Sequence, residues 1–305
     1  MAKQITVTMM GAEGVGKTTL LATMYRELNS IKSEFNIVAD NDTGTSLYKA
    51  YQTITEIINE QELHSQIRPF LPGTAGISEY RFECSFKNKK EFDFVFYDTK
   101  GGLLLSEDSD KTLKKFQARL KQSQVIINVV DGATYAAGSL LMADKVNLPI
   151  RVGEILNPIL RDQEPRLILF VITKCEKWLD EKKEDQLLKS FEEGHKNVLN
   201  LINNNRWIRG LFLPVKTLGC YRFDYAENTG KDNEKLVFHR TNREFKPERI
   251  EQPLCEAFKF ALAHYDRNRN LFNKIIQGIS GRRKTFEKLR KELTCGEPYK
   301  VYRKT

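Results

Sequence analysis

The sequence predicts an α/β protein with a doubly wound, mostly parallel sheet and one antiparallel edge hairpin. Three continuous apolar segments, QVIINVVDG, RLILFVITK and GLFLPVKTLG, are typical of strands that are covered on both faces. Helical patterns lie between them, near residues 140–160 and 181–203. A fourth apolar segment, ITVTMM, comes directly before a glycine-rich loop and a helix. Strands and helices that alternate in this way build a parallel sheet with helices on both faces.

The glycine-rich loop, GAEGVGKTTL at residues 11–20, matches the pattern G-x-x-x-x-G-K-[ST] between a predicted strand and a predicted helix. Its glycines let the backbone curl so that several N–H groups point inward and bind an anion, and the helix that follows adds the positive end of its dipole. We expect Lys17 to contact the β- and γ-phosphates of a nucleotide and Thr18 to bind Mg²⁺. The alternatives are a glycine-rich turn without a ligand and a dinucleotide site, and the latter fits worse because the third glycine of its pattern is missing. The predicted phosphate-binding residues are Gly11, Ala12, Glu13, Gly14, Val15, Gly16, Lys17, Thr18 and Thr19.

The segment after this helix is polar and has no regular apolar pattern. A helical pattern with Leu47, Ile54 and Ile58 on one face follows it. The loop RPFLPGTAGISE is rich in proline and glycine. The segments YRFECSF and FDFVFYD then alternate apolar and polar residues around the turn KNKK. This period of two predicts a β-hairpin at the edge of the sheet.

Asp98 stands at the end of the second hairpin strand and begins a D-x-x-G motif that ends at Gly101. A carboxylate at the end of a central strand, beside the phosphate loop, can hold Mg²⁺ through a water molecule. The backbone N–H of Gly101 can contact a γ-phosphate and move when that phosphate leaves. The alternative for Asp98 is a residue that caps a turn at a strand end.

Two further motifs end buried strands. Thr173, Lys174 and Glu176 occupy the tetrapeptide TKCE after RLILFVIT, and Thr217 and Leu218 lie in PVKTLG. By itself TKCE is also compatible with a charged surface turn.

In this order, the four motifs and the hairpin strand that leads into Asp98 resemble the Ras-like, or TRAFAC, class of P-loop GTPases over residues 4–265. The resemblance implies that the stem of Lys174 packs along the base and that Glu176 accepts hydrogen bonds from the N–H groups of guanine. The class usually has Asp where Glu176 stands. Backbone N–H groups of Thr217 and Leu218 would lie near the base.

The segments DTKGG, TKCE, PVKTLG and FKPERIEQPLCEAFKFAL also resemble the double-GTPase-type domains of bacterial conflict and defence loci. This likeness implies a protein that acts with other components of a multi-protein system.

The resemblance also implies which residues form the switch regions. Thr74 matches the threonine that closes on Mg²⁺ and the γ-phosphate, and Thr43 and Thr45 are alternatives further upstream. Lys17, Thr74 and Gly101 are therefore the candidate catalytic residues, and Thr18, Asp98 and Thr74 the candidate metal ligands. Gly102 stands where the class has a glutamine that orients water, so we expect slow intrinsic hydrolysis.

The chain divides into a predicted GTPase-like domain, residues 1–265, and a basic C-terminal helical extension, residues 266–305. The domain has an enlarged first switch region, residues 30–78, and a polar, loop-like insertion, residues 221–246. Residues 267–305 carry the whole net charge of +9, because they contain twelve Lys or Arg and three Glu. This segment is either the last amphipathic helix of the fold or a docking segment for an acidic partner or an anionic membrane surface. Nucleic acid fits less well, because the rest of the chain is neutral.

The sequence therefore predicts a protein that binds GTP or GDP with Mg²⁺, hydrolyses GTP slowly, and acts as a switch for a protein partner. Two alternatives are an adaptor that does not turn over its nucleotide and a P-loop protein that binds ATP; a small-molecule kinase fits less well. We expect a cytoplasmic protein with reduced thiols, because its five cysteines are widely spaced and no signal peptide or membrane span stands out.

Overall fold

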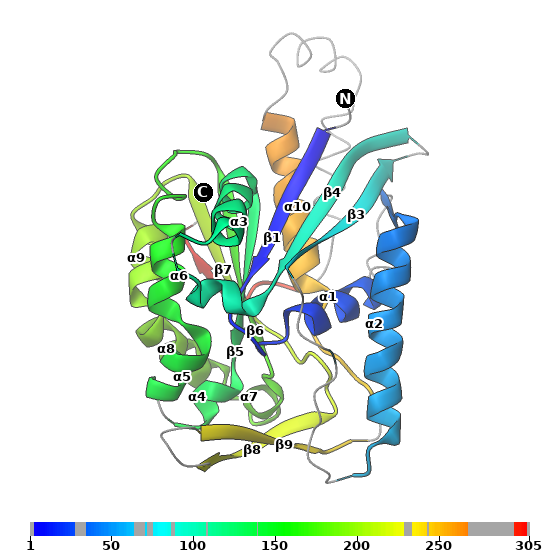
Figure 1. The fold of residues 1–305 in the computed structure, drawn as a ribbon, viewed down its shortest axis with the longest axis vertical. Coiled ribbons are helices and arrows are strands. Elements are labelled where there is room, and N and C mark those ends of the chain that lie inside the picture. Colours follow the sequence, from blue (N-terminus) through cyan, green and yellow to red (C-terminus); the bar gives the residue numbers. More distant parts are fainter. Residues whose placement is uncertain are drawn as a thin grey trace.

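A computed structural model describes residues 3–27, 35–63, 71, 76–86, 89–107, 109–138, 140–228, 234–242, 244–267 and 296–303. Within these residues, eight strands form one mixed sheet, and β8 and β9 form a separate antiparallel pair (Figure 1). The strands are β1 (Lys3–Met10), β2 (Phe35–Ala39), β3 (Ile77–Phe86), β4 (Lys89–Thr99), β5 (Val125–Asp131), β6 (Arg166–Thr173), β7 (Ile208–Pro214), β8 (Tyr221–Asn228), β9 (Glu234–Arg240) and β10 (Lys300–Tyr302).

The large sheet has the order β10-β7-β6-β5-β1-β4-β3-β2. The five strands from β7 to β4 in this order are parallel, whereas β3, β2 and β10 run antiparallel to their neighbours. The predicted doubly wound, mostly parallel sheet with an antiparallel hairpin is therefore confirmed. The carboxyl ends of β1, β4, β5, β6 and β7 all reach the same edge of the sheet, which is where the predicted motifs lie.

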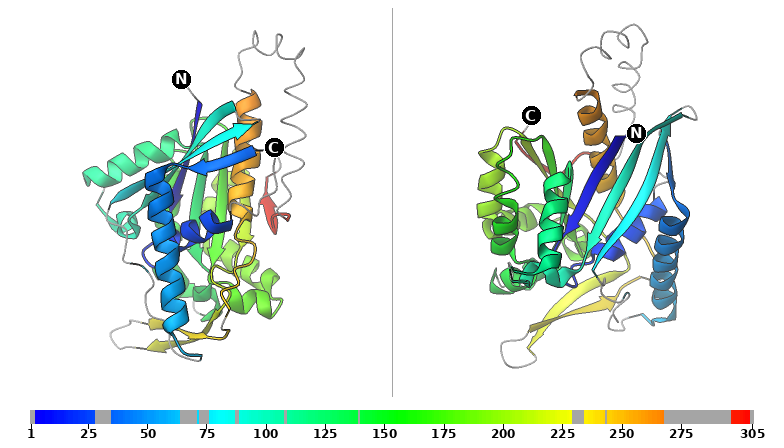
Figure 2. Two further views of the ribbon diagram at one scale, coloured as in Figure 1. Left: turned by 90° about the vertical axis from the view of Figure 1, so that its right-hand side faces the viewer. Right: turned by 45° about the horizontal axis from the view of Figure 1, so that its top comes forward.

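Helices cover both faces of the sheet (Figure 2). Phe94 of β4 stacks on Phe258 of α10, with ring centroids 4.6 Å apart. Three residues later, on the opposite face of β4, the ring of Tyr97 lies 4.7 Å from the guanidinium of Arg119 on α3. Alternate side chains of one strand thus contact helices on opposite faces. The helices are α1 (Lys17–Glu27), α2 (Asn41–Glu60), the 3-10 helix η2 (Gly101–Leu105), α3 (Lys111–Gln122), α4 (Ala133–Ala136), α5 (Leu140–Asn147), α6 (Pro149–Leu156), α7 (Glu176–Asp180), α8 (Glu184–Gly194), α9 (Lys196–Asn203) and α10 (Gln252–Arg267).

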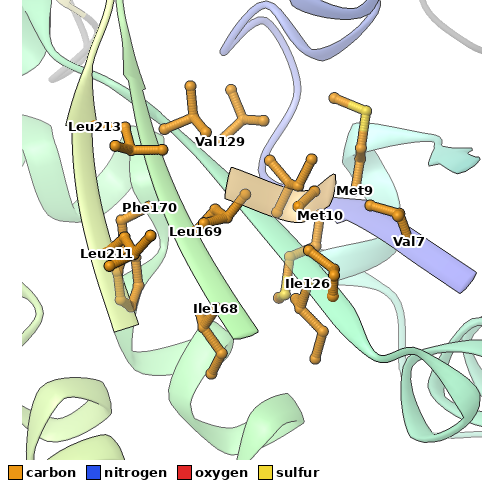
Figure 3. Close-up of a cluster of buried hydrophobic side chains, with 14 of the residues drawn as sticks. Val7, Met9, Met10, Ile126, Val129, Ile168, Leu169, Phe170, Leu211 and Leu213 are labelled. Carbon is orange, nitrogen blue, oxygen red and sulfur yellow. The ribbon is translucent and has the colours of Figure 1, made fainter. Parts of the chain in front are cut away.

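The core lies between these layers and is built on β1, β5, β6 and β7 (Figure 3). Every residue of β5 and β6 is buried. This burial on both faces explains why the sequences of these strands are continuously apolar rather than alternating.

Three segments differ from the prediction. The predicted hairpin, β3–β4, does not form the edge of the sheet, because the short strand β2 pairs with β3 outside it. Residues 221–246 were expected to be loop-like, but most of them form the β8–β9 hairpin. At the other edge β10 pairs with β7, so the end of the chain returns to the sheet.

The division into residues 1–265 and 266–305 stays a prediction, because residues 268–295 lie outside the described residues. In the described part of the chain, none of the helices is both long enough and apolar enough to cross a membrane. Cys84, Cys175 and Cys220 are buried free thiols. Cys255 is disulfide-bonded, contrary to the expectation of reduced thiols throughout.

Candidate functional site

The loop between β1 and α1 has the curled backbone that its glycines predict. Gly11 has a φ of 147° and Gly16 a φ of 93°, conformations that favour glycine. A Cβ atom on Gly11 would lie 2.5 Å from the carbonyl oxygen of Val129 on β5. The loop is therefore pressed against the neighbouring strand, and a side chain at Gly11 would displace it.

Lys17, in the first turn of α1, is directed back into this loop. Its Nζ donates hydrogen bonds to the carbonyl oxygens of Gly11, at 2.9 Å, and Ala12, at 2.8 Å. The residue is only 6 % exposed. Burial lowers the pKa of the Lys17 ammonium, and the charges of Asp98 and Glu13 oppose this shift. A buried cation inside an anion-binding loop is the arrangement that a polyphosphate requires.

Thr18, in the first turn of α1, lies beside Asp98, near the end of β4. The Thr18 hydroxyl donates a hydrogen bond of 2.8 Å to Oδ2 of Asp98, which is fully buried at the end of β4. Hydroxyl and carboxylate oxygens are ligands that Mg²⁺ prefers, so this pair fits a Mg²⁺ site. The described residues contain no cluster of three or more His, Cys, Asp or Glu side chains that could hold a metal ion. A Mg²⁺ ion here would take further ligands from phosphate oxygens, water and the predicted ligand Thr74.

The segment after Asp98 packs directly on the phosphate loop. A Cβ atom on Gly101 would lie 2.4 Å from Cα and 2.5 Å from N of Glu13. The far end of this segment is held by Arg151 of α6, whose Nε donates to the Leu104 carbonyl at 3.0 Å and whose Nη2 donates to the Ser106 carbonyl at 3.2 Å. The residues that follow the D-x-x-G motif are thus fixed by α6, while the glycine of the motif touches the loop that would hold the γ-phosphate.

The residues at the end of β6 contact the same loop from the other side. The Thr173 hydroxyl donates to the carbonyl oxygen of Val15 at 2.7 Å. Nζ of Lys174 donates to the carbonyl oxygen of Gly14 at 2.9 Å and pairs with the carboxylate of Asp131. Asp131 ends β5 beside Thr173 and has no role in the sequence analysis, although it stands in the VVDG that ends a predicted strand.

Glu176 faces the loop after β7. Its Oε1 accepts hydrogen bonds from the backbone N–H of Leu218, at 3.4 Å, and Gly219, at 3.2 Å. Burial raises the pKa of Glu176 to about 7, although hydrogen bonds from backbone N–H groups act in the opposite direction. In the described residues the buried hydroxyl of Thr217 has no hydrogen-bond partner. The structure therefore brings Glu176, Thr217 and Leu218 together, and their role in reading a base stays a prediction.

The β8–β9 hairpin, which the sequence analysis missed, borders this side of the site. It lies across the carboxyl end of the sheet, between α7 and the lower end of α2 (Figure 1). The ring of Phe238 lies 5.4 Å from Nζ of Lys174, and the ring of Phe223 lies 5.1 Å from Nζ of Lys177. The hydroxyl of Tyr221 donates a 2.6 Å hydrogen bond to Gln61, directly after α2.

Thr74 lies outside the described residues, so its role stays a prediction. Its two alternatives lie in the first turns of α2. The Thr43 hydroxyl accepts a hydrogen bond of 2.8 Å from the backbone N–H of Arg81 and so joins α2 to β3, and Thr45 is exposed.

A mostly parallel sheet with helices on both faces, a G-x-x-x-x-G-K-T loop after its first strand and Asp98 beside Thr18 define the P-loop GTPase class. Within this class the chain belongs to the family described as Double-GTPase 2, whose sequence profile matches residues 5–203. The fold is also similar to the GTPase-like domain of Ski7 from S. cerevisiae, solved with GTP and with GDP and inorganic phosphate. That chain is 14 % identical, with a TM-score of 0.40, over 71 % of this chain and 43 % of its own length.

The translation elongation factor SelB from Methanococcus maripaludis, solved with the GTP analogue GppNHp, is 16 % identical. Its TM-score is 0.31, over 71 % of this chain and 30 % of its own length. The chain thus spans less than half the length of these solved structures. No curated protein matches it significantly.

Proposed function

We propose that this protein binds GTP and GDP with Mg²⁺, hydrolyses GTP slowly, and acts as a nucleotide-controlled switch for a protein partner. The observation that carries the proposal is that the predicted base-reading residues contact the predicted phosphate loop. Lys174 donates to the carbonyl oxygen of Gly14 in the phosphate loop, and Glu176 contacts the N–H groups of Leu218 and Gly219. Lys174 and Glu176, which are suited to a base, are two residues apart, and Lys174 contacts the loop that is suited to phosphates.

The proposed base preference follows from the chemistry of a carboxylate, which accepts hydrogen bonds but does not donate them when ionised. Guanine presents two N–H donors, N1–H and the 2-amino group, on the edge that would face Glu176. Adenine presents an acceptor nitrogen at the corresponding ring position. The ionised Glu176 would therefore favour guanine.

Titration of the purified protein with GTP, GDP and ATP in the presence of Mg²⁺ tests this proposal. We expect GTP and GDP to bind at least about tenfold more tightly than ATP, because adenine lacks the N1–H and 2-amino donors with which the carboxylate would pair. Equal or tighter binding of ATP would contradict the assignment of Glu176 and favour an ATP-binding P-loop protein.

The proposed slow hydrolysis rests on Gly102, which has no side chain to orient a water molecule. Lys17, Thr18 and Asp98 would position phosphates and Mg²⁺, and the metal would neutralise charge on the phosphate oxygens. In a single-turnover assay with the protein alone, we expect a rate on the order of 10⁻³ s⁻¹ or slower, the scale of an unassisted GTPase. A much faster rate would contradict the prediction, and no phosphate release even with a partner would favour a non-hydrolysing adaptor.

Guanine binding should depend on pH through Glu176, whose pKa is raised to about 7. Since only the ionised carboxylate can accept hydrogen bonds from both guanine N–H groups, the fraction of protein with a competent Glu176 rises from about one tenth at pH 6 to about nine tenths at pH 8. We expect the GDP affinity to rise about tenfold over this range relative to a Glu176→Gln variant, which does not titrate. Parallel pH profiles for the two proteins, measured by calorimetry, would contradict this role.

The same shift has the opposite effect on folding. The folded protein holds the Glu176 proton more tightly than the unfolded chain does, because the pKa is raised from 4.5 to about 7. The contribution of Glu176 to the free energy of unfolding therefore falls as the pH rises through this interval.

The partner and its setting are also proposals. The family of the chain favours action with other components of a multi-protein system, including one of the bacterial defence type. The basic residues 267–305 would supply a docking segment for an acidic partner or an anionic surface.

A further inference from the structure

The aromatic ring of Phe238 lies against the ammonium group of Lys174, at 5.4 Å from Nζ to the ring centroid. Phe238 is on β9, and Lys174 follows β6. A cation at this distance from the face of an aromatic ring is attracted to it, and more strongly where water is excluded. Phe238 is 8 % exposed and the Lys174 side chain 29 %, so this contact is partly shielded from water.

Three groups from different elements surround the Lys174 ammonium. They are the Gly14 carbonyl of the phosphate loop, the Asp131 carboxylate at the end of β5, and the Phe238 ring. The backbone of Lys174 is in the left-handed region, with a φ of 54°, so the chain turns sharply as the strand ends. Because the lysine stem is long and flexible, its direction depends on the three groups that contact the ammonium.

The fold fixes the position of Phe238 independently of Lys174. Its ring meets that of Phe223 edge to face, with centroids 6.0 Å apart, and both pack against Ala133. The other end of the hairpin is joined to α2 by the hydrogen bond between Tyr221 and Gln61. The hairpin is thus anchored on both sides of the site.

We propose that Phe238 is a positioning residue of the nucleotide site, which holds the tip of Lys174 so that its stem lies along a guanine base. This inference rests on the proposed function, in which Lys174 contacts the base. The β8–β9 hairpin would accordingly contribute to the affinity for the nucleoside part of the ligand. It would contribute much less to the affinity for phosphates, because Lys17 is held by the phosphate loop itself, through the carbonyl oxygens of Gly11 and Ala12.

The test compares GDP and inorganic pyrophosphate as ligands of the full-length protein, measured by calorimetry with Mg²⁺. Phe238→Leu keeps an apolar side chain and removes the ring. We expect this variant to bind GDP about three- to tenfold more weakly, the range of a partly shielded cation–π contact. Its affinity for pyrophosphate should equal that of the unsubstituted protein.

Tyr225→Leu is the matched control, because it removes a half-exposed ring from the same hairpin. It should change neither affinity. If Phe238→Leu lowers the thermal midpoint, Phe238→Met fills the space with an unbranched side chain and should show the same loss for GDP.

Equal GDP affinities of the unsubstituted protein, Phe238→Leu and Phe238→Met would overturn the inference. So would a parallel loss for GDP and pyrophosphate, because that pattern indicates general damage to the site. Failure of the proposed function looks different: the unsubstituted protein would then show no preference for GDP over ADP.

Discussion

Replacement of Lys17 by alanine is expected to abolish nucleotide binding. The ammonium group is buried in the phosphate loop, where it donates to the carbonyl oxygens of Gly11 and Ala12. With a nucleotide bound, its hydrogen bonds to phosphate oxygens would each contribute about 1.5–3 kcal/mol, because they join two charged groups. Loss of two such bonds corresponds to a drop in affinity of about 100-fold or more, which calorimetry with GDP and Mg²⁺ measures.

Lys114→Ala is the control for this experiment, because Lys114 is an exposed lysine of α3, away from the loop. It should bind GDP as the unsubstituted protein does. If Lys17→Ala retained GDP affinity within a few fold, the loop after β1 would not be the phosphate site.

The second large effect is expected for Gly101→Ala. The new methyl group would lie 2.4 Å from Cα of Glu13, so either the D-x-x-G segment or the phosphate loop has to move. Arg151 holds the residues that follow this segment, at Leu104 and Ser106, which limits how far the segment can shift. Forced overpacking of this kind costs about 1–3 kcal/mol. We expect the thermal midpoint to fall and the GDP affinity to drop by about tenfold or more.

The neighbouring Gly102 offers a matched control, because a Cβ atom there would meet its nearest neighbours, the side chains of Lys100 and Glu13, at 3.8 and 3.9 Å. Gly102→Ala should therefore fold and bind GDP normally. Indistinguishable behaviour of the two alanine variants would show that the contact between Gly101 and the phosphate loop has no functional role.

The parts of the fold that the sequence predicts correctly are those whose pattern is local. β5 and β6 are buried on both faces, so their apolar runs identify them without knowledge of their neighbours. The phosphate loop is predictable for the same reason, because its conformation depends on the spacing of its own glycines, Lys17 and Thr18 and not on distant residues. The positions of Asp98 and Glu176 are predictable from their order along the chain, because the carboxyl ends of parallel strands lie at the same edge of a sheet.

The parts that the sequence does not predict depend on contacts between distant segments. The β8–β9 hairpin has its inward-facing rings, Phe223 and Phe238, among charged residues, and an irregularity between Phe223 and Tyr225 interrupts the alternation. Asp131 stands at an ordinary strand end, and only the register of β5 against β6 brings it to Lys174. Arg151 likewise reaches Leu104 and Ser106 only through the packing of α6.

The central claim is that one site holds phosphates at Lys17 and a guanine base at Lys174 and Glu176. A crystal structure of the protein with GDP and Mg²⁺ tests it most directly. We expect the phosphates to lie within the curled loop in contact with Lys17, and the guanine edge to lie within hydrogen-bond distance of the Glu176 carboxylate. A base bound away from Lys174 and Glu176, or a loop that remained empty at saturating GDP, would contradict the account.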